Sequence, residues 1–339
     1  MSVKKSLVIT TINKPNKAIN SFYKICKKNN VSLILIGDKK TPKYNSKYKL
    51  FDIKSQNKQL FKLSGKLPFN SYSRKNLGYL IAMKAKSKII IETDDDNYPK
   101  NNFFQNLEKQ RNSNIISGSN WINIYRYFSD LKNIWPRGFP LDEINKFKLG
   151  KKRKKNINSP VLQRMCDGNP DVDAIFRLTT NLGNIKFKNK LGFSLSKNSI
   201  CPFNSQNTVW HEESFPLLYL PSYCSMRATD IWRGYIALAI MHKYNWKLSF
   251  LNSTVIQKRN IHNLLNDFDL EQSVYKYSKS FNNTLSSIDL SIKKKDILIN
   301  IYKCYEALIK NKILEKRELN LVYKWLLDIH KIYPNLQKV

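Results

Sequence analysis

The chain lacks the features that mark membrane-spanning, secreted and cysteine-metal proteins. No apolar run approaches the length of about 18 residues that a transmembrane helix needs. The 5 cysteines are scattered and odd in number, so they predict neither a disulfide framework nor a zinc site, and they favour a reducing, cytoplasmic setting. The apolar run after Lys4 and Lys5 is too short for a secretory signal, and we expect it to form the first core strand.

Acidic residues are scarce as well, since 25 Asp and Glu stand against 59 Lys and Arg and give a formal net charge of +34. One interpretation of this charge is nucleic-acid binding, in which lysines and arginines of the protein neutralise phosphates. A second interpretation is attachment to an anionic membrane surface, which attracts lysines. A general bias toward Lys, Asn and Ile would give the charge no function. The chain has no helix-turn-helix, zinc-finger, RNP or KH motif, which argues against nucleic acid. The densest basic run, KKRKK at 151–155, is predicted to lie in a polar loop.

The hydrophobic pattern predicts a folded α/β protein. Hydrophobic residues make up 42% of the 339 residues and aromatic residues 12%, enough for a sizeable core. Strand patterns at 7–11, 31–36 and 89–93 alternate with helix patterns at 17–29 and 73–86. Such alternation is typical of a mostly parallel sheet flanked by helices.

The later part of the chain is predicted to add an acceptor-binding half and a helical extension. The middle is richer in Pro, Gly and Trp and has weaker periodicity, as in loops that decorate a sheet. Apolar residues at 297–309 and 319–332 predict two helices that cap the domain, pair with a second copy or lie on a membrane. The predicted parts are a nucleotide-binding half (1–116) and an acceptor half (117–270) of one domain (1–270), followed by the helical extension (271–339).

The segment KIIIETDDDNYP, residues 88–99, carries the strongest chemical signal. An apolar strand runs into Asp94, Asp95 and Asp96, and Pro99 ends it. In an extended chain Asp94 and Asp96 point the same way and Asp95 points away. Neighbouring carboxylates repel unless a cation lies between them, and such hard oxygen ligands suit Mg²⁺ or Mn²⁺ that also binds a diphosphate. The pattern therefore predicts a metal-dependent nucleotide-sugar site, with an acidic surface turn as the alternative.

Sheet topology brings other polar residues toward the same place. Ligands of parallel α/β sheets bind beyond the carboxyl ends of the strands. Thr10 and Thr11 end the first predicted strand, and Asp38 follows the second. We therefore expect these residues to line the nucleotide site together with the three aspartates.

Further candidates lie in the second half of the chain. Asp171 and Asp173 share one face if the chain is extended there, and they either serve the acceptor hydroxyl, as ligand or base, or form a turn and a helix N-cap. Asp230 precedes a helical pattern that contains Arg233, and it is either an acceptor-site carboxylate or an N-cap. The neutral imidazole of His262 would suit a metal already held by carboxylates, although a lone histidine is more often structural.

Six segments, taken in order, resemble the STELLO-type glycosyltransferases, a family distantly related to the reversibly glycosylated polypeptides of plants. They cover about residues 6–269 and leave the C-terminal helical pair outside. The segments are SRKNLGYLIAMKAKSKIIIETDDDNYP, DVDAIFRLT, PFNSQNTVWH, FPLLYLP, TDIWRGYIA and QKRNIHN.

The resemblance implies a GT-A fold that binds a nucleotide with the help of Mn²⁺ or Mg²⁺. It implies that Asp94 and Asp96 hold the metal, that Asp230 lies near the acceptor and that His262 completes the metal shell. The residues expected to bind the donor are Thr10, Thr11, Asp38, Arg74, Asn76, Asp94, Asp95, Asp96 and Arg233.

The sequence thus predicts transfer of a sugar from a nucleoside diphosphate sugar, UDP-sugar foremost, to a glycan or lipid-linked acceptor. An inverting reaction needs a carboxylate base, with Asp230 the first candidate and Asp173 the second; in a retaining reaction both would only bind sugar. The basic surface would suit an anionic acceptor or the inner face of a membrane. The alternatives are a nucleotide-sugar mutase and a non-catalytic binding scaffold.

Overall fold

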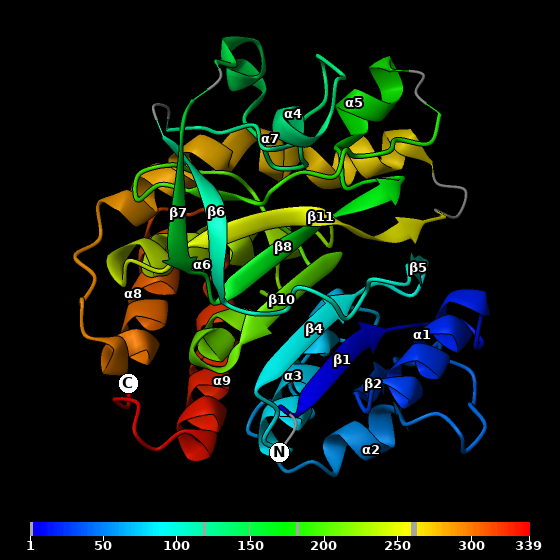
Figure 1. Cartoon of the computed structure of the whole chain (residues 1–339). Coiled ribbons are helices and arrows are strands. Elements are labelled where there is room, and N and C mark those ends of the chain that lie inside the picture. The colour runs from blue at the N-terminus through cyan, green and yellow to red at the C-terminus, as the bar shows by residue number, and fades with distance from the viewer. Residues whose placement is uncertain (1–2, 118–119, 149, 181–182, 259–262) are drawn as a thin grey trace.

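The computed structural model describes residues 3–117, 120–148, 150–180, 183–258 and 263–339. One sheet of 11 strands lies at the centre of this described part, in the order β3-β2-β1-β4-β10-β8-β11-β9-β6-β7, with β5 paired to β11 (Figure 1). The strands are β1 (Lys5–Thr10), β2 (Ser32–Ile36), β3 (Leu50–Phe51), β4 (Ile89–Thr93), β5 (Asn97–Pro99), β6 (Gln110–Ser117), β7 (Lys151–Asn158), β8 (Val161–Gly168), β9 (Phe193–Leu195), β10 (Asn207–His211) and β11 (Leu248–Gln257).

Helices cover both faces of the sheet. None of the described helices combines the length and the apolarity that a membrane crossing requires. The α-helices are α1 (Lys17–Lys28), α2 (Ile53–Asn57), α3 (Lys75–Lys84), α4 (Tyr125–Phe128), α5 (Ala174–Thr179), α6 (Thr229–Lys243), α7 (Leu264–Ser286), α8 (Ile297–Lys310) and α9 (Glu318–Ile332), and the 3-10 helices are η1 (Tyr72–Arg74), η2 (Leu141–Lys146), η3 (Glu212–Leu218) and η4 (Lys294–Asp296).

The first third of the chain forms the predicted parallel unit. Strands β3, β2, β1 and β4 pair in parallel, and α1 and α3 occur where the periodicity predicted helices. Phe22 of α1 packs with one face of this unit, and Leu80 of α3 packs with the other. Gly78 lets α3 approach the sheet closely, because a Cβ there would lie 2.5 Å from Val8 Cγ1. The predicted α/β class is confirmed.

The second half makes the sheet mixed rather than mostly parallel. Strand β10 pairs antiparallel with both β4 and β8. Strand β11 pairs parallel with β8 but antiparallel with β9 and β5. The prediction of a mostly parallel sheet is therefore wrong for this half, where the antiparallel pairs β10–β8 and β6–β7 occur beside the parallel pairs β8–β11 and β6–β9.

The basic run forms an edge strand, which corrects the prediction of a loop. Strand β7 pairs antiparallel with β6 along its whole length, from Lys151 opposite Ser117 to Asn158 opposite Gln110. The five basic side chains are exposed. Lys152 Nζ lies 5.3 Å from the ring centroid of Tyr127. Periodicity could not reveal this strand, because both of its faces are polar.

The predicted C-terminal helical pair is confirmed as α8 and α9. These helices, orange to red in Figure 1, pack against each other, and α9 also contacts α3. Trp325 is fully buried and donates its indole N–H to the Pro216 carbonyl, while Asp328 accepts the backbone N–H of Leu63 at 3.0 Å. The apolar face of α9 is thus buried within the chain, which favours the capping alternative. The domain boundary predicted at residue 270 falls inside α7, and the division stays a prediction.

Candidate functional site

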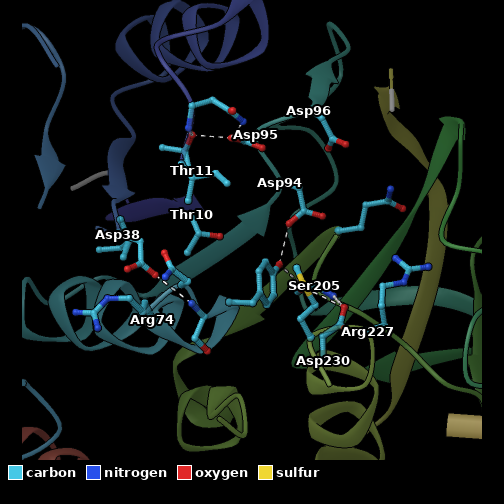
Figure 2. A pocket seen from close by; sticks show the side chains of 18 of the residues that line it. Thr10, Thr11, Asp38, Arg74, Asp94, Asp95, Asp96, Ser205, Arg227 and Asp230 are labelled. Carbon is cyan, nitrogen blue, oxygen red and sulfur yellow. Dashed lines mark hydrogen bonds between the residues drawn. The ribbon is translucent and has the colours of Figure 1, made fainter. Parts of the chain in front are cut away.

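A cavity of about 490 Å³ opens beyond the carboxyl ends of β1, β2 and β4, where parallel sheets bind their ligands. One wall comes from these strand ends, and the opposite wall comes from the residues around the start of α6 (Figure 2). Residues predicted from the sequence that line the cavity are Thr10, Thr11, Asp38, Arg74, Asp94, Asp95, Asp96, Asp171 and Asp230.

The three consecutive aspartates form a turn and do not continue the strand. Strand β4 ends at Thr93, and the backbone N–H of Asn97 closes the turn on the carbonyl of Asp94 at 3.3 Å. Asn97 Nδ2 also donates to Thr93 Oγ1 at 2.9 Å. The alternation expected for an extended chain therefore does not apply, and all three carboxylates line the cavity.

Asp95 ties the turn to the loop that follows β1. Its Oδ2 accepts Thr11 Oγ1 at 2.6 Å and Asn13 Nδ2 at 3.0 Å. Asn16 Nδ2 donates to its backbone carbonyl at 2.8 Å. Figure 2 shows Asp95 meeting Thr11, while Asp94 and Asp96 lie farther from that residue. Two of the predicted donor-binding residues, Thr11 and Asp95, thus hold each other.

Asp94 is held through one carboxylate oxygen. Its Oδ1 accepts the Tyr72 hydroxyl at 2.7 Å and lies 3.4 Å from Lys75 Nζ. The Lys75 side chain has 0% exposure, and its ammonium also donates to the Tyr72 hydroxyl at 2.7 Å and to the Thr93 carbonyl at 2.9 Å. Burial raises the pKa of Asp94, while Lys75 and Tyr72 oppose that shift. A buried cation thus lies directly beneath the aspartate turn.

Asp96 is also held through one oxygen. Its Oδ2 accepts Gln257 Nε2 at 2.8 Å, and Gln257 Oε1 in turn accepts Gln206 Nε2 at 2.8 Å. The other oxygen, Oδ1, is buried and has no hydrogen-bond partner among the residues that the structure describes. Burial, followed by the charge of Asp94, raises the pKa of Asp96 to about 7. Both features indicate that this carboxylate has no positive partner within the described part of the chain.

The chemistry of these donors fits a divalent cation that also binds substrate. Mg²⁺ is usually bound in proteins through one or two carboxylates together with phosphates and water. Asp94 and Asp96 would supply two hard oxygen ligands, and Oδ1 of Asp96, without a hydrogen-bond partner among the described residues, is the kind of atom that such a cation would satisfy. Over the described ranges, no group of three or more His, Cys, Asp or Glu side chains is placed to hold a metal ion, so the substrate phosphates and water would have to supply the other ligands. His262, the predicted third ligand, falls outside the described residues.

A second pair of aspartates forms the opposite wall around one arginine. Arg137 Nε and Nη2 each donate at 2.7 Å to the two carboxylate oxygens of Asp171. Arg137 Nη2 also lies 3.0 Å from Asp230 Oδ1. The three side chains are 5%, 6% and 8% exposed, which makes this a buried charge cluster with a net charge of −1. Arg137 is directly followed by Gly138 at φ +90, where a Cβ would lie 2.6 Å from Ile231.

Asp230 lies in the first turn of α6, but its carboxylate does not cap that helix. It accepts both the backbone N–H and the hydroxyl of Ser205 at 3.1 Å, besides its bonds to Arg137. Burial by itself raises the pKa of Asp230, yet Arg137 and Arg233 outweigh it and bring the pKa below its usual value. The Ser205 hydroxyl is 2.6 Å from that of Tyr72, so hydroxyl groups connect Asp230 with Asp94 (Figure 2).

Three predicted site residues do not line the cavity, because each is engaged elsewhere. Asn76 bonds both backbone groups of Leu220 at 2.8 Å. Arg233 pairs with the buried Glu92 at 2.9 Å. Asp173 caps α5 by accepting the N–H of Phe176 and also accepts the Trp135 indole, which is the N-cap alternative. The lining of the cavity therefore includes none of Asn76, Arg233 and Asp173.

Arg74 and Asp38 line the cavity, but local bonds occupy part of each side chain. Arg74 directs Nε and Nη2 to Gln56 Oε1 at 3.0 and 2.5 Å. Asp38 Oδ2 accepts the backbone N–H of Ser71 at 3.1 Å. Arg74 therefore organises the loop before η1, whereas its own role toward a nucleotide stays a prediction.

The residues that sequence reasoning missed are those that hold the aspartates. Lys75 directly follows Arg74 in the first segment of the family resemblance, which begins at Ser73, so a signal was present for Lys75, whereas Tyr72 lies one residue before that segment. Arg137 lies in a Trp-Pro-Arg-Gly turn that gave no chemical signal. Ser205 and Gln257 are single polar residues far from the aspartates in the chain, and only the fold brings them together.

Comparison with known proteins supports a relationship to one family. The family model described as "STELLO glycosyltransferases" matches residues 227–339. Two proteins of Arabidopsis thaliana, named Probable glycosyltransferase STELLO2 and Probable glycosyltransferase STELLO1, are 27% and 28% identical over 253 residues. The match covers 68% of this chain and 32% of each relative, so the chain spans about a third of their length.

Among solved structures, a protein described as "Crystal Structure of a Mycobacterial Protein" matches with 9% identity and a TM-score of 0.41, covering 82% of this chain and 74% of that chain. The family model extends over α7, α8 and α9, so the prediction that the helical pair lies outside the family resemblance is wrong. The chain is thus similar to the STELLO glycosyltransferases, the family that its own sequence segments resemble.

Proposed function

We propose that this chain is a glycosyltransferase that moves a sugar from a nucleoside diphosphate donor to a hydroxyl of a glycan or lipid-linked acceptor. The observation that carries the proposal is the cavity at the strand ends. On one wall Asp94 and Asp96 are each hydrogen-bonded through one carboxylate oxygen, and the opposite wall contains Asp171 and Asp230. The relationship to proteins named as probable glycosyltransferases supports the same reaction class. Dependence on Mn²⁺ or Mg²⁺, and UDP as the nucleotide, belong to the proposal.

On the donor side, Asp94 and Asp96 would hold the cation. The cation would neutralise the charge that develops on the departing diphosphate. Thr10 and Asp38, at the ends of β1 and β2, line the part of the cavity where a nucleoside would lie in a sheet of this kind. The protein's own contribution is to fix both carboxylates before the donor arrives.

On the acceptor side, Asp171 and Asp230 offer carboxylate oxygens to sugar hydroxyls. Arg137 keeps Asp230 ionised, since it helps to lower the pKa of that carboxyl. A general base works best with a pKa near the working pH, so the same arginine makes Asp230 a weak proton acceptor. This arrangement favours binding and orientation of sugar hydroxyls over proton removal. The second predicted base, Asp173, lies outside the cavity lining.

A screen of donors tests the proposal directly. The full chain is incubated with UDP-, GDP- and CMP-sugars, with and without Mn²⁺, and its unfolding temperature is followed. A donor present at about 100 times its dissociation constant should stabilise the chain by about 2.7 kcal/mol. We expect stabilisation by a diphosphate donor only when Mn²⁺ is present, and its loss in Asp94→Asn and Asp96→Asn. Asp130→Asn, at a carboxylate that is 78% exposed, is the matched control and should respond as wild type does.

Product analysis separates the alternatives. Release of free nucleoside diphosphate that increases with an added glycan acceptor supports transfer. An isomerised donor without that release would indicate a mutase, and the absence of any Mn²⁺-dependent stabilisation would leave only the scaffold.

The exposed basic strand β7 favours anionic partners. Its five consecutive cations would suit an acidic glycan acceptor or the anionic inner face of a membrane, which is the peripheral, cytoplasmic location expected from the sequence. Binding to phosphatidylserine vesicles and to an acidic polysaccharide, compared at two salt concentrations, distinguishes these partners.

A further inference from the structure

The two carboxylates proposed to hold the cation are anchored in the same way. Each gives one oxygen to a neutral side chain from another element, Tyr72 for Asp94 and Gln257 for Asp96. The hydrogen bonds and the ion pair that the structure assigns to the Asp94 carboxylate all end on Oδ1, and the one to the Asp96 side chain ends on Oδ2. Each carboxylate thus keeps one oxygen for a further ligand.

We infer that Tyr72 and Gln257 are positioning residues that aim the free oxygens of Asp94 and Asp96 at one cation. The inference rests on the proposed function and names residues that act through the carboxylates without touching the metal. The terminal torsion of an aspartate is broad, so a carboxylate at a cavity wall rotates unless one of its oxygens is held. Holding one oxygen fixes the direction of the other before the cation binds.

Lys75 determines the direction of the bond from Tyr72. An ammonium group can only donate, so the Tyr72 hydroxyl accepts from Lys75 and keeps its own hydrogen for a neighbour. That neighbour is Asp94 Oδ1 at 2.7 Å or the Ser205 hydroxyl at 2.6 Å. An ionised carboxylate can only accept, so the contact with Asp94 uses the Tyr72 hydrogen, and the Ser205 hydroxyl then donates to Tyr72 in place of its longer contact of 3.1 Å with Asp230.

The backbone around Gln257 is held in place as well. Gln257 ends β11 and pairs with Asn97, directly after the aspartate turn, on one side and with Gly168 on the other. Gly168 has φ +84, and a Cβ there would lie 2.4 Å from the Gln257 carbonyl oxygen. Gln206 Nε2 occupies Gln257 Oε1, which leaves the Nε2 group of Gln257 turned to Asp96. The amide therefore has a defined orientation.

The test measures Mn²⁺ binding to the full chain from the electron paramagnetic resonance signal of free Mn²⁺. The variants are Gln257→Leu and Tyr72→Phe, neither of which changes the net charge. Each has a control with the same chemical change on an exposed helix position, Gln272→Leu on α7 and Tyr323→Phe on α9. Loss of groups that orient metal ligands typically weakens metal binding 10- to 100-fold. We therefore expect the dissociation constant for Mn²⁺ to rise by roughly that factor in both test variants and to stay at the wild-type value in both controls.

A double variant shows whether Gln257 acts through Asp96. If it does, adding Gln257→Leu to Asp96→Asn produces no further loss of Mn²⁺ affinity. If Gln257→Leu instead weakens Mn²⁺ binding by the same factor in Asp96→Asn as in wild type, Gln257 has a merely structural role and the inference is overturned. Circular dichroism of each variant confirms that the measured chains are folded.

The results for the wild-type chain separate this inference from the proposed function. A wild-type chain that binds no Mn²⁺, alone or with UDP, overturns both. A wild-type chain that binds Mn²⁺ while Gln257→Leu and Tyr72→Phe bind equally well overturns the inference alone and leaves the metal-dependent transferase in place.

Discussion

Replacing Arg137 by methionine should strongly destabilise the fold, because the arginine is the shared cation of two buried aspartates. It contacts Asp171 through two hydrogen bonds of 2.7 Å and Asp230 at 3.0 Å. Methionine preserves much of the apolar length of the side chain but removes the charge. The variant then keeps two carboxylates in a low-dielectric wall with no cation between them.

The expected size follows from the burial of the cluster. All three side chains are under 10% exposed, so solvent screening gives little relief. Removing one partner of a buried ion pair typically costs about 3–5 kcal/mol. Arg153→Met is the matched control, since Arg153 is exposed on β7, and a surface change of this kind should stay within about 0.5 kcal/mol.

The pH dependence gives a second readout. In wild type the pKa of Asp230 is lowered, so its contribution to stability is present above the unfolded value of 3.8 and is lost as the pH falls through the still lower folded pKa. In Arg137→Met burial should instead raise the pKa of Asp230, and the folded variant takes up a proton in acid. The deficit should therefore shrink between pH 8 and pH 5, by up to about 1.4 kcal/mol per pH unit once protonation begins.

Urea unfolding followed by tryptophan fluorescence measures both quantities at each pH. A deficit below about 1 kcal/mol would be the value of an exposed ion pair and would refute the buried cluster. A deficit that stays constant from pH 8 to pH 5 would refute the assignment of its origin to uncompensated carboxylates.

Three further predictions concern the fold around the site. Glu318→Ala should lower the free energy of unfolding by roughly 2–4 kcal/mol in urea, since the buried carboxylate accepts the Tyr219 hydroxyl and two backbone N–H groups that would lose their acceptor; the exposed Glu315→Ala should have little effect. Gly78→Ala should lower the midpoint of thermal unfolding through a cost of about 1–3 kcal/mol, despite the better helix propensity, because its Cβ would overlap the sheet, whereas Gly183→Ala meets no neighbour within 4 Å; equal midpoints would contradict the close approach of α3. Burial raises the pKa of Asp173 to about 7, so ionised Asp173 opposes folding progressively from pH 4 to pH 7, and the stability of Asp173→Asn relative to wild type should rise over that range in urea titrations; a flat difference would place that titration elsewhere.

The sequence predicted those parts of the fold that depend on local periodicity. The helix predicted at 17–29 is α1, and the pair predicted at 297–309 and 319–332 is α8 and α9, because their apolar residues recur at helical spacing. The strand before the aspartates was equally clear from its isoleucines. The order and direction of strands in the second half were not predictable, since strands such as β7, with polar residues on both faces, and β8, buried along its whole length, show no alternation of apolar and polar residues.

Of the candidate site, the sequence predicted the aspartates that line the cavity but not the residues that hold them in place. Asp94 and Asp96 stand out because carboxylates after an apolar strand have a distinct chemistry. Lys75 did not stand out, because in a chain with 59 basic residues a single lysine is expected to be exposed to solvent. Only the structure reveals that its side chain is buried. Gln257 is uncharged and belongs to no motif, and it lies far from Asp96 in the sequence. Its contact with Asp96 depends on the pairing of β11 with β5, which the sequence pattern did not predict.

The basic edge strand also bears on the resistance of the protein to aggregation through strand pairing. An outermost strand offers free backbone groups on which another chain can assemble, and lysine is a common protection against such growth. If two β7 strands paired, the Cβ atoms of facing residues would lie about 5 Å apart, and their like charges would repel. Replacing residues 151–155 by threonine should therefore increase light scattering during storage, and an unchanged, clear solution would deny the strand this part. The run of basic residues would then oppose edge-to-edge assembly of the sheet, independently of any ligand that it binds.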